Sequence, residues 1–223
     1  TSFADQHQEL ENVHLEVFRE DGAVSDKLSA QKAVYVPSDN KDFTIYLSRS
    51  VVIETRDSLK VRTEQLTYKK LDETAAAEEL VEFERMNVQG RSMGAMVRVK
   101  EKIIELHRDV SIRDGEGDDA STLNAGLAVY DQAREQLELQ NGVEVKTVSG
   151  SKPPTQIDLN SNRASVFFAA NENEREIDRA EMFGGVQIIS NEAGKEPTRI
   201  DANYALFQKP IERFDLKAAV RIT

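Results

Sequence analysis

Two arginines occupy positions where the surrounding sequence places apolar side chains. Arg49 and Arg108 each lie midway between a leucine and a valine, in segments where every second residue is otherwise apolar. A guanidinium in such a place has two interpretations. It binds a phosphate through paired, charge-assisted hydrogen bonds, or it marks a β-bulge or sheet margin that turns the side chain to water. The second case is the more common, and the recurrence at one repeat position keeps phosphate contact as a hypothesis.

The remaining polar residues suggest no catalytic or metal site. The histidines His7, His14 and His107 are far apart in the sequence, whereas a zinc site needs ligands that converge. The acidic stretch Asp114–Asp119 lacks the spacing and the terminal glutamate of a calcium-binding loop. A glycosidase would need two carboxylates facing each other, and the apolar parity offers none. We therefore expect no enzymatic activity, no metal and no cofactor.

Composition limits the class of partner and of environment. The formal net charge of -11 argues against nucleic-acid binding, which depends on Lys and Arg neutralising phosphates. The chain contains no Cys and therefore no disulfide. The sequence contains no run of about 18 apolar residues, so it predicts no membrane-spanning helix. Because the sequence starts at Thr1 without a Met, we expect that a signal or anchor segment has been removed.

The two arginines belong to a repeated strand pattern. In Gln136–Lys146 the odd positions are mostly apolar and the even positions mostly polar. This alternation predicts a β-strand with one apolar and one solvated face. The same spacing, with a variable residue at its centre, recurs in residues 45–53, 104–112, 137–145, 180–188 and 214–222.

A shorter pattern precedes these segments. It consists of an apolar residue, two alanines three positions apart and an aromatic residue, and it is clearest at Leu28–Tyr35, Leu123–Tyr130 and Ile200–Phe207. Polar turns such as Asp131–Arg134 connect the two parts. The repeated unit is thus a strand, a turn and a longer strand. Serial strand pairs without intervening helices predict an all-β fold of antiparallel strands.

Other segments refine this plan. Residues 71–86 are rich in helix formers, and we interpret them as a long turn leading into a strand from Leu80. Gly184 and Gly185 predict a bulge or a close backbone approach. The acidic stretch 114–119 is taken as the join between two halves. The aromatic residues that end the first strands are predicted to be packing plugs: Tyr35, Tyr68, Tyr130, Phe168 and Phe207.

The apolar parity leaves two functions open. Most apolar faces pack on each other, which would make this a structural repeat scaffold with a filled core. An incompletely filled face would instead form an apolar groove able to hold an acyl chain. The last strand, Phe214–Thr223, carries no proline and few charges, so its edge is available for pairing with another chain.

The strand pattern resembles the OstA family of lipopolysaccharide-transport proteins, which includes LptA and LptC. Residues 10–113 are similar to LptC, through Val13–Phe18 before Asp21 and Gly22, the segment 28–35, and residues 90–110. Residues 120–223 are more similar to the OstA/LptA module, most clearly at Leu123–Ala125, Tyr130, Leu139 and Val143. We expect an LptC-like part at 1–114 and an OstA/LptA-like part at 118–223, a fused arrangement that is unusual, in one continuous or two separate jellyrolls.

The resemblance implies an open, V-shaped β-jellyroll that carries the acyl chains of lipid A between two sheets in the periplasm. It implies pairing with other jellyroll proteins of a transport bridge, head-to-tail association of like chains, and an inner-membrane ABC transporter as the source of energy. It also implies an N-terminal tether to the inner membrane. The edge-strand residues expected to dock partners are Val13, Leu15, Val17, Phe214, Leu216 and Val220.

The residues expected to line the lipid groove share the apolar parity of the repeated strands. They are Ile45, Leu47, Val51, Ile53, Ile104, Leu106, Val110, Ile112, Leu137, Leu139, Val143, Val145, Met182, Val186, Ile188, Leu216, Val220 and Ile222.

Overall fold

The computed structural model is built almost entirely of antiparallel β-strands, which confirms the all-β prediction. It divides into two compact units, residues 1–107 and 108–223. It describes residues 7–18, 24–38, 42–56, 58–115, 117, 120–149, 155–169, 177–211, 213–217 and 220–223.

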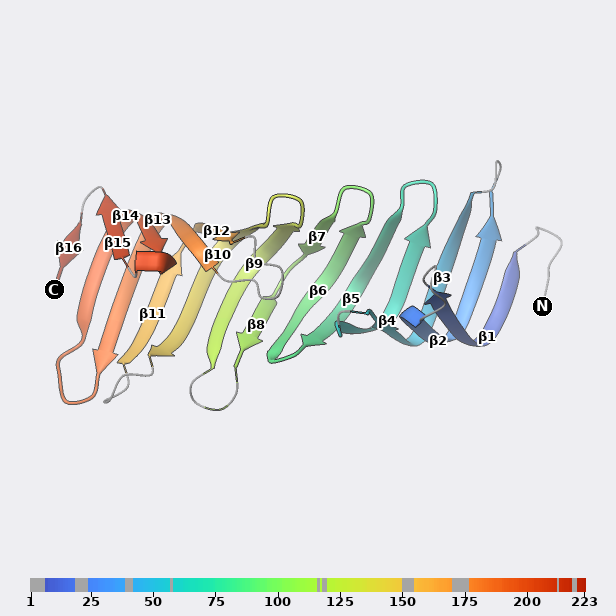
Figure 1. Cartoon of the computed structure of the whole chain (residues 1–223), viewed down its shortest axis with the longest axis horizontal. Coiled ribbons are helices and arrows are strands. Elements are labelled where there is room, and N and C mark those ends of the chain that lie inside the picture. Colours follow the sequence, from blue (N-terminus) through green and yellow to red (C-terminus); the bar gives the residue numbers. More distant parts are fainter. Residues whose placement is uncertain are drawn as a thin grey trace. The chain divides into compact units, whose positions relative to one another are not determined.

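In the first unit each strand pairs with the next in the chain (Figure 1). The strands are β1 (Gln8–Phe18), β2 (Val24–Pro37), β3 (Phe43–Glu54), β4 (Lys60–Lys69), β5 (Thr74–Arg85), β6 (Val88–Arg98) and β7 (Ile103–Leu106).

In the second unit, β10 pairs with β9 on one side and with both β11 and β12 on the other. β11 and β12 also share β13 as their next neighbour, so together they act as one strand interrupted at Asn162. The elements are β8 (Val110–Asp114), β9 (Ser121–Asp131), β10 (Gln136–Ser149), β11 (Thr155–Ser161), β12 (Arg163–Phe168), β13 (Ile177–Glu192), β14 (Thr198–Gln208), the 3-10 turn η3 (Lys209–Ile211), β15 (Arg213–Lys217) and β16 (Arg221–Ile222).

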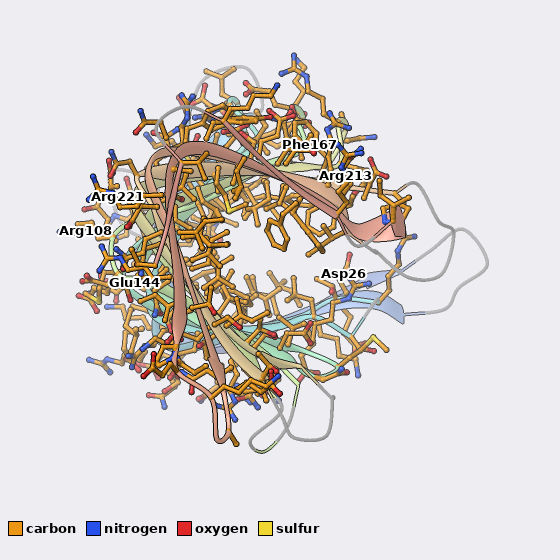
Figure 2. The ribbon with its side chains drawn as sticks, turned by 90° about the vertical axis from the view of Figure 1, so that its left-hand side faces the viewer. Asp26, Arg108, Glu144, Phe167, Arg213 and Arg221 are labelled. Carbon is orange, nitrogen blue, oxygen red and sulfur yellow. The ribbon has the colours of Figure 1, made fainter. Side chains whose placement is uncertain are left out.

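The long strands are interrupted near their middles. Pairing registers shift between Ser48 and Val51 in β3, between Gln140 and Val143 in β10 and between Phe183 and Val186 in β13. The residues in between have positive φ: 64° at Arg49, 54° at Ser50, 65° at Asn141, 85° at Gly142, 73° at Gly184 and 59° at Gly185. A bulge of this kind bends its strand. Figure 2 shows the foremost strands of the second unit, in faint red, running from one arm of the ribbon into the other.

Each unit therefore has two arms that meet at the bend. We call the arm on the side of Leu47 in the first unit, and of Leu139 and Met182 in the second, the leucine-side arm. The arm on the side of Val51, or of Val143 and Val186, is the valine-side arm. The predicted bulge at Gly184 and Gly185 is confirmed, since both residues lie in this bend.

Inner-face side chains alternate in size from strand to strand at the bend. Paired neighbours on the valine side are Val51, Thr63, Val81 and Ser92 in the first unit, and Val110, Ala125, Val143 and Ser161 in the second. On the leucine side of the second unit they are Ala128, Leu139, Ala164, Met182, Ala205 and Leu216. All except Leu216 are buried. Large residues beside small ones fill the narrow inside of the bend. This explains the two alanines of the shorter sequence pattern, since one lies on each side of the bend.

The buried hydroxyls at the bend are satisfied locally. Thr63 Oγ1 donates to the Leu80 carbonyl at 2.9 Å, and Ser92 Oγ donates to the Gly94 carbonyl at 3.0 Å. Ser161 Oγ likewise donates to the Arg163 carbonyl at 3.2 Å. Buried polar groups are costly only when they lack a partner, so these hydroxyls are compatible with an apolar core.

Two expectations need correction. Residues 71–86 are not a long turn leading to Leu80, because β5 starts at Thr74 and pairs Ala75 with both Tyr68 and Val97. The last segment, Phe214–Thr223, is not a strand throughout either, because Val220 lies outside both β15 and the short β16 and is 43% exposed. Residues 218 and 219 lie outside the described residues.

The division at 107/108 puts the acidic stretch between β8 and β9, inside the second unit. Residues 116, 118 and 119 of this stretch lie outside the described residues, as does the Asn171–Glu174 turn.

Candidate functional site: the apolar inner face

The predicted groove residues nearest the bend form a tightly packed core. Leu47 and Val51 belong to one cluster with Ala30 and Ala33, against which Ile45 packs. The buried members of the predicted set are Leu47, Val51, Val110, Leu139, Val143, Met182, Val186 and Ile188.

Burial decreases away from the bend. The half-buried members of the predicted set are Ile45, Ile53, Ile104, Leu106, Ile112, Leu137, Val145 and Leu216. Val220 and Ile222, beside the C-terminal edge, are 43% and 65% exposed. The inner face is therefore closed at the bend and partly accessible along both arms.

The two arms present different side chains. On the valine-side arm of the second unit, register places a row of aliphatic residues side by side: Ile112, Leu123, Val145, Leu159, Ile188, Ile200 and Ile222. On the leucine-side arm, aromatic rings meet. Tyr130 and Phe168 pack edge to face at 6.0 Å, and Phe207 lies 4.7 Å from Phe214.

The first unit repeats the aromatic arrangement. The Phe43 ring lies 5.3 Å from Tyr35 and 6.2 Å from Tyr68. Tyr35, Ile45 and Tyr68 are cross-strand neighbours on the inner face. The predicted packing role of these aromatic residues agrees with these ring contacts.

Arg49 and Arg108 are both exposed. Arg49 lies in the bulge of β3 with φ 64°. This agrees with the second interpretation given above, a β-bulge that turns the side chain to water. Arg108 precedes Asp109, which also has positive φ. In Figure 2 the labelled Arg108 and Glu144 lie on the outer side of the ribbon. Phosphate contact by these arginines stays a prediction.

The strands at the two chain ends carry exposed apolar side chains on the inner face. β1 pairs with β2, and Leu15 is 48% exposed. Phe214 of β15 is 42% exposed beside β14. Val13 and Leu216 are half-buried, and only the backbone of Val17 is described. These strands supply backbone groups and apolar surface of the kind used in strand addition.

One further segment has the spacing of a known catalytic motif. Residues 90–94, Gly-Arg-Ser-Met-Gly, match the spacing of a nucleophile elbow, in which a serine projects from a strand-to-helix turn. Here the segment lies within β6, Ser92 is 1% exposed, and its hydroxyl bonds the Gly94 carbonyl. The phenyl ring of Phe83 covers Gly90. Ser92 therefore stabilises the bend and has no access to a substrate.

Charges on the outer face pair with one another. Lys60 lies 3.0 Å from Glu54 and, through that hydrogen bond, lowers the pKa of the Glu54 carboxyl. Arg199 lies 3.0 Å from Asp201 and lowers its pKa in the same way. Exposed pairs of this kind contribute little to stability. In the described parts of the chain, no cluster of His, Asp and Glu suited to a metal ion occurs.

No helix within the described residues is long and apolar enough to cross a membrane. A family model described as lipopolysaccharide-assembly, LptC-related matches residues 3–115. The match includes the first unit and β8 of the second. No curated protein matches the chain.

Proposed function

The chain belongs to the LptC-related family of lipopolysaccharide-assembly proteins, and from this we propose that it carries lipid A acyl chains along its inner face in the periplasm. A role in lipopolysaccharide transport follows from the family. The groove, its ligand and the compartment are our proposal.

The graded burial of the inner face is the observation that supports this proposal. A face that packed on itself would be buried throughout, whereas Ile45, Ile53, Leu137 and Val145 are half-buried although they are aliphatic and share one parity. Covering such surface with an acyl chain is favourable by about 0.8 kcal/mol for each CH₂ removed from water. An acyl chain would thus complete the apolar core that the two arms begin.

The second unit has the same design, although the family match ends at residue 115. Leu139 and Val143 flank its bend as Leu47 and Val51 flank the bend of β3, and all four are buried. We infer that this unit is an OstA/LptA-like jellyroll that also holds acyl chains.

Partner binding is proposed at the edge strands. β1 and β15 would add to the strands of other jellyroll proteins, or of a second copy of this chain, by backbone hydrogen bonding. Transport of this kind makes and breaks no covalent bond in the chain itself. The energy would come from an inner-membrane ABC transporter, and the chain would not be an enzyme.

Site-specific photo-crosslinking tests the groove. A photoreactive residue at Leu137 or Val145, on the half-buried inner face, should label lipid A when purified lipopolysaccharide is added. The matched control is Glu144, the neighbour of Val145 that points to the outer side in Figure 2, and it should not label.

Absence of label from every inner position would favour the alternative of a scaffold with a filled core. Equal labelling from Glu144 and Val145 would also contradict the proposal, because lipid would then bind without regard to the face.

A further inference from the structure

The aliphatic row of the second unit ends in a row on the same face that carries four hydroxyls, one carboxylate and one isoleucine. In each strand, the residue two positions beyond the aliphatic row lies on the same side of the sheet. The pairing registers place these residues side by side: Asp114, Ser121, Thr147, Ile157, Ser190 and Thr198. Ser121 Oγ and Thr147 Oγ1 are 2.8 Å apart and share a hydrogen bond. We call this set the hydroxyl row.

This row differs from its surroundings. The equivalent positions of the first unit are Asp26, Thr55, Leu59, Arg85 and Val88, which include two aliphatic residues and an arginine. The other arm of the second unit carries the aromatic rings of Tyr130, Phe168, Phe207 and Phe214, and the Tyr130 hydroxyl donates a hydrogen bond to Glu135. Four of the six positions on this lip of the second unit therefore carry hydroxyls, whereas only Thr55 does so among the five equivalent positions of the first unit.

We propose that the hydroxyl row binds the sugar part of the lipid whose acyl chains lie on the neighbouring aliphatic row. This inference rests on the proposed function and adds an orientation to it: acyl chains toward the bend, sugar at the end of the valine-side arm. The second unit would then distinguish a glycolipid from a simple fatty acid.

The chemistry of the row favours a sugar over a phosphate. Each hydroxyl can donate one hydrogen bond and accept two, which matches the hydroxyl and amide groups of a sugar. The row contains a carboxylate, Asp114, and neither Lys nor Arg, so it offers no charge-assisted bond to an anion. Ser121, Thr147 and Ser190 are half-buried and Thr198 is exposed, so the row lies at the border between apolar surface and water.

The test compares two matched double variants of the whole chain. Thr147→Val with Ser190→Ala removes hydroxyls from the row while keeping side-chain size. Thr122→Val with Ser111→Ala makes the same two changes on the outer face, where Thr122 pairs with Lys146 and Ser111 with Asn124. Binding of lipid A, myristate and dimyristoyl phosphatidic acid would be measured by displacement of a fluorescent fatty acid.

We expect the inner variant to bind lipid A about tenfold more weakly, equivalent to about 1.4 kcal/mol, and to bind myristate and phosphatidic acid as the wild type does. The outer variant should bind all three lipids unchanged. Thr198→Val, at an exposed position, should weaken lipid A binding in the same direction and serves if the double variant folds poorly.

Several outcomes would overturn the inference. Unchanged lipid A affinity in the inner variants, or an equal loss of affinity for lipid A and for myristate, would show that the hydroxyls do not bind the sugar. A loss for phosphatidic acid as large as for lipid A would indicate a phosphate site instead. A wild-type chain that binds none of the three lipids would refute the proposed function, and this inference with it.

Discussion

Replacing Gly184 by alanine tests the account of the bend most directly. Gly184 has φ +73°, a left-handed conformation that L-residues adopt at a cost. A Cβ at this position would lie 2.8 Å from Nδ2 of Asn162, closer than non-bonded atoms allow. Asn162 also donates its backbone N–H to the Gly184 carbonyl at 2.9 Å, so the two residues cannot move apart freely.

The expected cost has two parts. Left-handed backbone costs alanine about 1–2 kcal/mol. The contact with Asn162 adds about 1 kcal/mol, the lower end of the range for overpacking, because Asn162 is exposed and its amide can turn away. Gly142→Ala is the matched control: its φ is +85° and nothing lies within 4 Å of the added Cβ. It should cost only the first part.

Urea unfolding followed by far-ultraviolet circular dichroism would measure both variants. We expect Gly184→Ala to lose more unfolding free energy than Gly142→Ala, and Asn162→Ala combined with Gly184→Ala to remove the difference. If Gly184→Ala lowers the unfolding free energy no more than the control does, or if Asn162→Ala does not relieve the loss, the close approach of residues 162 and 184 is not a source of strain at the bend.

Three further predictions use single positions or one segment. Leu139→Ala, at a position that is 1% exposed, should lower the free energy of unfolding in urea by about 2–5 kcal/mol. Leu137→Ala, at a half-buried position, should lower it clearly less, and equal losses would contradict the graded burial. Deleting 214–223 should reduce end-to-end association in analytical ultracentrifugation, and unchanged association would remove this edge as a docking strand. Arg49→Ala should change unfolding free energy by less than about 0.5 kcal/mol and leave lipopolysaccharide binding intact, whereas a loss of binding would establish the phosphate contact.

Strand parity could be predicted because it is a local property of the chain. Side chains two residues apart share a face, so Leu139 and Val145 are assigned together from sequence alone. The bend at Gly184 was likewise visible, since glycine signals unusual backbone. At Arg49 and Ser50 neither residue type favours positive φ, and the signal for a bulge was instead a charged side chain at a position where the strand pattern places apolar residues.

The sequence pattern could not predict which residues pair with one another across strands. The Ala and Glu residues of β5 favour a helix by intrinsic preference, yet Ala75 lies between Tyr68 and Val97, where a small residue fits between large neighbours. The hydroxyl row was missed for the same reason. Thr147 and Ser190 are far apart in the chain, and only their common pairing with Ile157 of β11 places them on one lip.

The alternation of large and small side chains along the bend constrains how such a chain can change in length during evolution. Removing or inserting one strand would set valine against valine, or alanine against serine, and leave a clash or a void at the vertex. A gene duplication that copies strands two at a time preserves the alternation. The number of strands in such chains is therefore expected to vary in steps of one hairpin, each step adding one large and one small inner-face side chain at the bend.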